Sequence, residues 1–366
     1  MLFSSDKAER FLRSCYANEI GGFRFHQNGH ITLLSTCFGV QSAHLLGCLN
    51  GFDIAGIRDL LISSQMPNGL FMDRAFNSEQ LQGQQDELYV KWQFTFFALC
   101  ALECLDAKPQ SNLAFLDKYL DDKCLSEWFA ELNWSNFWYC SNQIMFLMFF
   151  LVYEKDRAIG ARVSACEQAL DRCFNELDAR QDPGTGFWGD NVKHDVLNGL
   201  YGAAHILMFY RYMNRQVRHA DKIADTTLHC QNPEGLYGAR WGGACEDYDG
   251  VEVLIRVFDL VYDRRRSQIS DSLDRTLQRI SLSQSENGGF GYSLPGNGMT
   301  GLINKARMIL GGQVNYSYSG WSRMQSNRLE PDLWGTYFRL LTIAQIQRSN
   351  RAGMNWRFIG LPGWGY

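Results

Sequence analysis

Five stretches of the chain repeat apolar residues at positions i, i+3 and i+4, which is the pattern of helices packed against a core. They cover residues 32–49, 86–105, 195–210, 247–262 and 332–346 and are rich in Leu, Phe, Ala and Met. Four of them open with Asp, which complements the positive end of a helix. With only seven prolines in 366 residues, the pattern predicts an all-α protein.

A short loop motif recurs along the chain, each time ahead of an apolar helix. It occupies residues 65–71, 181–188, 231–237 and 284–290, and three copies read Gln-x-x-x-Gly-x-aromatic while the second has one extra residue. Glycine permits the positive φ of a tight turn, Pro or Asn starts that turn, and the Gln amide can bond free backbone groups at a helix end. The motif therefore predicts helical hairpins of one repeated design.

The spacing of these loops sets the size of the repeat. Their starts lie 116, 50 and 53 residues apart, so we expect one decayed copy in the double-length gap, near residues 121–133. About 50 residues per hairpin gives roughly six hairpins over this length. No linker or low-complexity tract divides the chain. We therefore predict a single domain over residues 1–366, an (α/α)6 toroid whose inner helices surround a central cavity.

The repeated loops are similar to the QW repeats of the terpenoid-cyclase and protein-prenyltransferase superfamily. The last apolar segment, Asp-Leu-Trp-Gly-Thr-Tyr-Phe-Arg-Leu-Leu at residues 332–341, resembles the closing inner helix of those toroids. The resemblance extends over roughly residues 30–346. It implies an α/α toroid, and it implies chemistry less strongly because function depends on the site rather than the fold.

An acid cluster, Cys-Glu-Asp-Tyr-Asp-Gly at residues 245–250, lies near the start of a predicted inner helix. Asp247, Tyr248 and Asp249 resemble the first three positions of the Asp-x-Asp-Asp motif with which class II terpene cyclases protonate an alkene. That resemblance implies Asp249 as the proton donor, tuned by Asp247 and Tyr248. Gly250 replaces the fourth acid. The alternative interpretation is a group of acids that caps a helix.

A polar stripe on the helix expected at residues 195–210 is the second candidate site. His194, Asn198, Tyr201 and His205 are spaced by four, three and four residues, which places them on one helix face. Two imidazoles and a phenol facing the cavity could act as acid, base or substrate anchor. A hydrogen-bonded ladder without chemistry explains the stripe equally well.

Further polar and aromatic residues are predicted to face the cavity and contact substrate. Aromatic rings, 14% of the chain, can stabilise a carbocation or stack on a sugar ring. Arg240 is a candidate contact for an anionic group. The other candidates are Thr36, Gln41, His44, Asp86, Tyr89, Gln93, Trp138, Tyr139, Asn142, Gln143 and Trp188.

Composition and charge limit the classes of molecule that this protein is expected to bind. The net charge of −4 gives no basic surface for nucleic acid. Eleven scattered cysteines without a C-x-x-C pair, and a polar segment at residues 1–10, indicate a reduced, cytoplasmic compartment. The most apolar run, residues 144–153, is half as long as a bilayer crossing requires. We expect a small, apolar substrate and no transmembrane segment, while peripheral association with a membrane stays open.

Cofactor and metal motifs are missing from the sequence. A zinc prenyltransferase needs a His after its Asp and Cys ligands, but the last histidine, His229, precedes Cys245 and Asp247. P-loop, dinucleotide-binding, nucleophile-elbow and Asp-rich diphosphate motifs are likewise absent from the sequence. We therefore expect no cofactor and no metal.

These observations favour an enzyme that acts on an isoprenoid or similarly apolar substrate by acid-initiated cyclisation or isomerisation. Two alternatives stay open. Toroids also serve intracellular carbohydrate-active enzymes, glycosidases or lyases that use paired carboxylates. The second alternative is a non-catalytic binding or scaffold protein whose ring offers a surface to partners.

Overall fold

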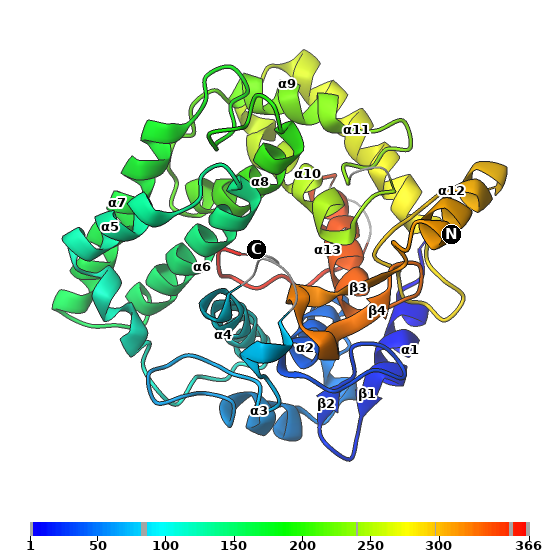
Figure 1. The fold of residues 1–366 in the computed structure, drawn as a ribbon, viewed down its shortest axis with the longest axis horizontal. Coiled ribbons are helices and arrows are strands. Elements are labelled where there is room, and N and C mark those ends of the chain that lie inside the picture. The colour runs from blue at the N-terminus through cyan, green and yellow to red at the C-terminus, as the bar shows by residue number, and fades with distance from the viewer. Residues whose placement is uncertain (1–2, 82–85, 239–240, 297, 351–353, 364–366) are drawn as a thin grey trace.

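The computed structural model describes residues 3–81, 86–238, 241–296, 298–350 and 354–363, and it is an α/α toroid (Figure 1). Within these residues, six helical hairpins each pair an outer with an inner helix. The outer helices are α1 (Ser5–Cys15), α3 (Ile54–Ile62), α5 (Asp122–Glu131), α7 (Ala161–Arg180), α9 (Ala220–Cys230) and α11 (Asp263–Ser281). The inner helices are α2 (Leu33–Leu46), α4 (Glu87–Cys104), α6 (Phe137–Lys155), α8 (Val196–Tyr212), α10 (Ala244–Val257) and α13 (Leu333–Ser349).

The inner helices form a closed ring. Each contacts the next in chain order, and α13 closes the ring by packing against α2 as well as α10. Figure 1 shows the outer helices at the periphery and the inner ones around the centre. The predicted all-α toroid is therefore confirmed, and α5 with α6 forms the hairpin at the place where a decayed loop was expected.

The glutamine of each repeated loop binds two hairpins together. The side-chain amides of Gln65, Gln181, Gln231 and Gln284 each donate to the carbonyl of the glycine in their own loop. Each amide also donates to a backbone carbonyl of the neighbouring hairpin. These carbonyls belong to Ser111, Arg218, Ser272 and Ser4, respectively. The four loop glycines have φ between 78° and 97°, where a side chain is strained. The loops are therefore joints between neighbouring hairpins.

Most inner helices begin where the sequence predicts. Thr32, Asp86, Asp195 and Asp332 are the N-caps of α2, α4, α8 and α13, and each side chain accepts a backbone N–H from the first turn, as capping residues do. The exception is α10, expected to begin at Asp247, which begins at Ala244 instead. The reason is that the Asp247 carboxylate binds the preceding loop rather than capping the helix.

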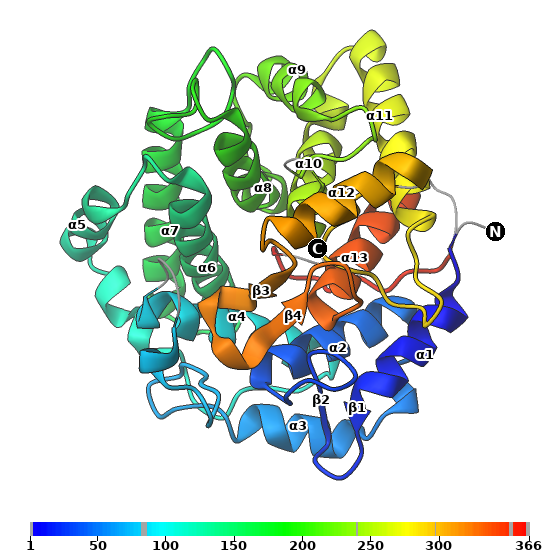
Figure 2. The ribbon, with the colours of Figure 1, turned by 45° about the vertical axis from the view of Figure 1, so that its right-hand side comes forward.

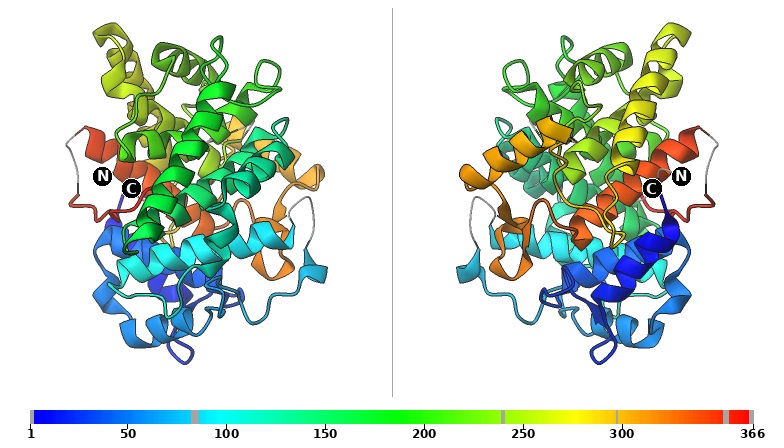
Figure 3. Two further views of the ribbon diagram at one scale, coloured as in Figure 1. Left: turned by 90° about the vertical axis from the view of Figure 1, so that its left-hand side faces the viewer. Right: turned by 90° about the vertical axis from the view of Figure 1, so that its right-hand side faces the viewer.

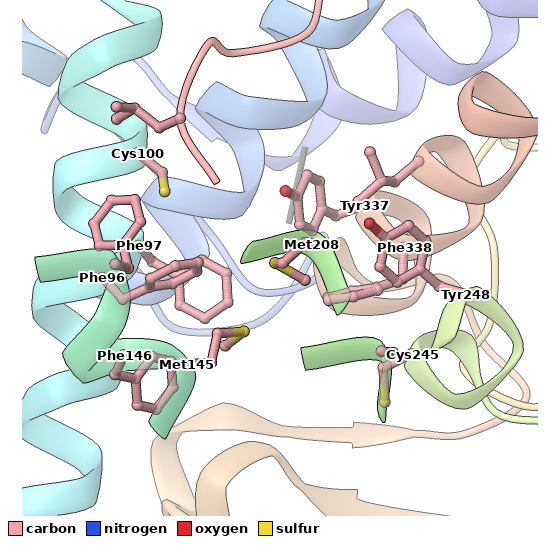
Figure 4. Close-up of a cluster of buried hydrophobic side chains, with 14 of the residues drawn as sticks. Phe96, Phe97, Cys100, Met145, Phe146, Met208, Cys245, Tyr248, Tyr337 and Phe338 are labelled. Atoms are coloured by element: carbon pink, nitrogen blue, oxygen red, sulfur yellow. The ribbon is translucent and has the colours of Figure 1, made fainter. Parts of the chain in front are cut away.

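Apolar side chains fill the centre of the ring. Figure 4 shows side chains from α4, α6, α8, α10 and α13 converging there, among them Phe97, Phe146, Met208, Tyr248 and Phe338, all of which are buried. These side chains form the central plug of the ring.

Two further segments cover opposite faces of the ring (Figure 3). One is the insertion, residues 291–331, which separates the last repeated loop from α13. It contains α12 (Gly298–Leu310) and the antiparallel pair β3 (Asn315–Ser317) and β4 (Gln325–Asn327), with Tyr316 opposite Ser326. The other is the C-terminal segment, residues 354–363, where Gly363 lies against the ring of Phe96. A second short pair, β1 (Tyr16–Ala17) and β2 (Gly22–Phe23), joins α1 to α2.

Candidate functional site

A cavity of about 710 Å³ lies between the inner ring and the insertion. The first turns of α4, α6, α10 and α13 contribute residues to its wall, and β3 with the turns after it covers one side. Its aromatic lining consists of Tyr89, Trp138, Tyr292, Tyr316, Tyr318 and Trp334. Its other side chains include Gln93, Asn142, His205, Cys245, Asp249, Gln325 and Arg328. The cavity thus combines aromatic walls with a few polar groups.

Asp249 lies on this wall and is 1% exposed. Neither of its carboxyl oxygens has a hydrogen-bond partner among the described residues. Burial raises the pKa of Asp249 well above its ordinary value, and the nearby carboxylates of Glu246, Glu252 and Asp247 raise it further. Both effects disfavour the charged form of Asp249, and the carboxyl group has no hydrogen-bond partner among the described residues.

The three neighbouring acids are bound elsewhere. Glu246 accepts a hydrogen bond of 2.6 Å from the Tyr292 hydroxyl, and Glu252 forms a buried ion pair with Arg256. Asp247 pairs with Arg339 at 2.5 Å, where both side chains are inaccessible to solvent. Each of these three side chains is therefore held by a partner of its own, and none of them bonds Asp249.

Asp247 has a structural role in the described chain. Its carboxylate accepts the backbone N–H groups of Tyr237 and Gly238, at 2.7 and 2.6 Å, and that of Gly243 at 3.2 Å. Three other hairpins use threonine for the same contact. Phe23 of β2 and the loop aromatics Phe71 and Phe290 donate their backbone N–H to Thr36, Thr95 and Thr336, respectively. Asp247 is therefore the counterpart of these threonines, and it does not line the cavity.

Tyr248 also lies outside the cavity. It is buried in the central plug, where its ring meets that of Phe338 edge-on at 5.5 Å. Burial raises its pKa well above the ordinary value. The three residues therefore have different roles. Asp247 binds the preceding loop, Tyr248 packs in the central plug, and only Asp249 lines the cavity.

The four residues of the polar stripe predicted on α8 do not all face the same surroundings. His194 lies in the turn before the helix and is exposed, because α8 begins at Val196. Asn198 bridges to α6, accepting the N–H of Trp138 and donating to Asn136. Tyr201 donates to the carbonyl of Tyr237 at 3.2 Å. The prediction that all four share one helix face toward the cavity is wrong, since only His205 lines it.

His205 is buried, and its Nδ1 lies 2.9 Å from the hydroxyl of Ser141. Burial lowers its pKa to about 3. The ring is therefore neutral at physiological pH and can serve as a proton acceptor or hydrogen-bond partner inside the cavity.

Four of the predicted substrate contacts line the cavity: Tyr89, Gln93, Trp138 and Asn142. Tyr89 stacks on Tyr139 with ring centroids 4.6 Å apart. Asn142 donates to the carbonyl of Trp138, and the Trp138 indole is 37% exposed at the mouth. These four residues therefore stay candidate substrate contacts.

The structure places two other predicted contacts away from the cavity. Trp188 is buried, and its indole N–H donates to the carbonyl of Leu177 in α7. His44 lies near the end of α2, beside Arg357 of the C-terminal segment, in a small separate recess. Arg240 lies outside the described residues. The position of Trp188 follows from the repeat itself, since loop aromatics pack between helices instead of lining the ring.

Comparison with known protein families gives one result. The model of the prenyltransferase alpha-alpha toroid domain matches residues 2–127 and 110–303. The chain belongs to this family. No curated protein sequence matches the chain significantly. The family match supports the predicted fold and an isoprenoid-type small molecule as the ligand of the toroid.

A zinc centre of the prenyltransferase kind does not fit this toroid. Asp247, one of the two residues that could ligate zinc, is saturated by three backbone N–H groups and Arg339. The other, Cys245, donates to Glu246 at 3.2 Å, and burial raises its pKa well above the ordinary value. Within the described residues no group of three His, Cys, Asp or Glu side chains could hold a metal ion.

The cavity is also lined by residues that were not predicted from the sequence. Tyr292, Tyr316, Tyr318, Ser319 and Arg328 all come from the insertion. The guanidinium of Arg328 lies over the rings of Tyr292 and Tyr316, 4.9 and 5.2 Å from their centroids. A signal was present, because the interval between the last repeated loop and α13 is too long for a turn and contains Tyr-Ser-Tyr-Ser at residues 316–319.

Proposed function

We propose that this toroid is an enzyme that protonates a carbon–carbon double bond of an isoprenoid or similarly apolar substrate, with Asp249 as the acid. The observation that carries the proposal is a buried carboxyl group that faces the cavity and has no hydrogen-bond partner among the described residues. A carboxylic acid acts as a strong general acid when burial and nearby negative charge hold its proton until substrate binds.

The reaction would proceed in balanced steps. The O–H proton of Asp249 adds to one alkene carbon, the π electrons form the new C–H bond, and a carbocation remains on the other carbon. A second double bond can close a ring by attacking that cation, or the cation can lose a neighbouring proton directly. In either case one proton enters and one leaves, so the product is an isomer of the substrate.

Two features of the cavity support the later steps. The rings of Trp334 and Tyr318, whose centroids lie 4.1 Å apart, and that of Trp138 can stabilise a cation through their π faces. His205 is neutral and lies in the same cavity, so its ring can accept the final proton. We assign it this role.

The two alternative functions have less support. Glycoside hydrolysis uses two carboxyl groups on either side of the scissile bond, whereas Asp249 is the one carboxylic acid among the described residues that line the cavity. A binding protein without chemistry would use the same aromatic walls, so the test must separate binding from turnover.

The test uses linear C15, C20 and C30 isoprenoids and the C20 isoprenoid diphosphate as probes. We expect one of them to raise the melting temperature of the protein, since a ligand of the folded state stabilises it by mass action, and to yield an isomeric product by mass spectrometry. Asp249→Asn should keep the thermal shift but lose about 10²–10⁴-fold in turnover, whereas the exposed Asp190→Asn should change neither. Binding without an isomeric product in the wild type, or full activity of Asp249→Asn, would refute the proposal.

A further inference from the structure

Helix α12 carries a concentration of exposed apolar side chains. Of the twelve large hydrophobic residues that are exposed in the described chain, five belong to this one helix: Met299, Leu302, Ile303, Ile309 and Leu310. Leu310 is 87% exposed and Met299 is 73% exposed. A contiguous apolar surface of this kind marks a contact with another molecule or with a membrane.

These five side chains, named here the α12 apolar face, form one continuous stripe. At 3.6 residues per turn they occupy an arc of roughly 120° around the helix axis. The opposite side packs on the protein, because Met308 and Gly301 are buried and the Asn304 amide donates to the carbonyl of Pro295 at 2.8 Å. Since the helix already buries one face, the apolar face is a second, separate surface.

Basic side chains border this face on both sides. On the same helical projection Lys305 lies about 40° beyond one edge of the stripe, and Arg307 lies about 40° beyond the other. Both are exposed, and neither forms an ion pair with a described residue. The sequence of α12 contains no acid, and residues 291–331 contain four Lys or Arg against the single acid Glu330, in a chain with a net charge of −4. The face is therefore suited to a negatively charged, amphipathic surface.

The helix also lies next to the cavity. Four residues separate Leu310 from β3, and Asn315, Tyr316 and Ser317 of β3 line the cavity. Figures 2 and 3 show α12 and the β3–β4 pair on the same face of the ring, and Figure 3 shows the C-terminal segment on the opposite face. A surface that binds α12 would therefore lie beside the cavity covered by the insertion.

We infer that α12 docks this protein onto the surface of an anionic lipid bilayer. The apolar face lies at the boundary between headgroups and acyl chains, and Lys305 and Arg307 contact anionic headgroups, as amphipathic helices with basic borders do. No helix in the described chain is long and apolar enough to cross a bilayer, so the contact is interfacial. The inference does not depend on the chemistry assigned to Asp249.

The experiment is co-sedimentation of the full chain with vesicles of phosphatidylcholine alone, or with 30% phosphatidylglycerol added. We expect binding that is stronger on the anionic vesicles. A variant carrying Leu302→Gln, Ile303→Gln, Ile309→Gln and Leu310→Gln should lose at least about ten-fold in affinity, because several apolar side chains no longer insert. All four residues are exposed, so the variant should keep the wild-type circular dichroism spectrum and melting temperature.

The matched control replaces exposed apolar residues elsewhere, with Ile159→Gln, Leu260→Gln and Leu282→Gln, and should bind vesicles like the wild type. Lys305→Gln with Arg307→Gln should weaken binding to anionic vesicles by about five-fold per charge and leave binding to neutral vesicles unchanged. Asp249→Asn should bind vesicles normally whether or not it is active. If the wild type does not sediment with either vesicle, or if α12 instead mediates a concentration-dependent dimer that the glutamine variant abolishes, the inference is overturned.

Discussion

The ring of Tyr237 lies directly on the backbone of Gly250 in α10. A Cβ atom at Gly250 would come within 2.1 Å of a Tyr237 ring carbon, well inside any real contact. The ring cannot easily move away, because it is buried and its hydroxyl bonds that of Ser272 at 2.6 Å. This contact explains why glycine stands where the Asp-x-Asp-Asp motif has its last acid: the loop aromatic of the hairpin occupies the space of a side chain.

Replacing Gly250 with alanine should therefore destabilise the toroid by about 1–3 kcal/mol, the usual effect of overpacking a core. The steric effect must exceed the roughly 1 kcal/mol that alanine gains over glycine inside a helix. Urea unfolding followed by circular dichroism measures the difference. Gly360→Ala, where a Cβ would meet nothing within 4 Å, is the control. Combining Gly250→Ala with Tyr237→Leu should recover part of the loss, and strictly additive effects would show that the two sites do not interact.

The buried pair of Asp247 and Arg339 gives a second prediction. Asp247→Thr introduces the residue that other hairpins use at this position, but it leaves the Arg339 guanidinium without its carboxylate in the core. Such an unpaired charge costs about 3–5 kcal/mol. Asp247→Thr combined with Arg339→Met should restore most of that loss, which chemical denaturation of the three variants can measure. A double variant as unstable as the sum of the two singles would contradict the structural role assigned to Asp247.

The same residues show how far sequence reasoning reaches. The helical period and the repeated loops predicted the ring, because each hairpin forms its turn and buries its inner helix with the same residue types. The function of Asp247 could not be predicted, since its equivalence to Thr36, Thr95 and Thr336 depends on which backbone N–H groups the fold brings to it. An acid near a helix start suggests a cap, and only the tertiary contacts separate it from Asp249, two residues later.

The cavity was less predictable than the ring for a related reason. A polar stripe in the sequence can indicate an inner helix. It does not show which turn of that helix reaches the cavity, because this depends on how the helices pack together. His205 lines the cavity and Tyr201, one turn earlier, is bound to the Tyr237 carbonyl. The insertion follows no repeat, so its tyrosines and Arg328 lacked a pattern that placed them over the ring.

Closure of the ring by Gln284 is open to test. Its side chain accepts the N–H of Ser4 and donates to the carbonyls of Ser4 and Gly288, all at 2.9 Å. Gln284→Ala should lose about 2–3 kcal/mol, at about 1 kcal/mol for each hydrogen bond, and should speed amide exchange in α1. Gln65→Ala removes the matching bonds to Ser111 and Gly69, and it should leave α1 protected. Equal exchange of α1 in both variants, measured by mass spectrometry, would contradict the closing role.

The proton on Asp249 should be visible in the stability of the protein. The pKa of this carboxyl is raised in the folded state, whereas an unfolded Asp ionises near pH 3.9. The sign follows from linkage: the stability associated with the neutral acid is fully present below about pH 4 and is lost as the pH rises toward the folded-state value. Asp249→Asn cannot ionise in either state, so it should be more stable than the wild type by an amount that grows about 1.4 kcal/mol per pH unit above pH 4.

Urea unfolding of both proteins at each pH from 4 to 8 measures this difference directly. The exposed Asp190→Asn controls for removing one carboxylate from the chain, and its difference from the wild type should stay small throughout. The growth should stop where the folded wild type begins to ionise, so the break in slope reports the pKa of Asp249 without any substrate. A difference between Asp249→Asn and the wild type that is flat from pH 4 upward would mean that Asp249 is ionised in the folded protein, and an ionised Asp249 has no proton to give an alkene.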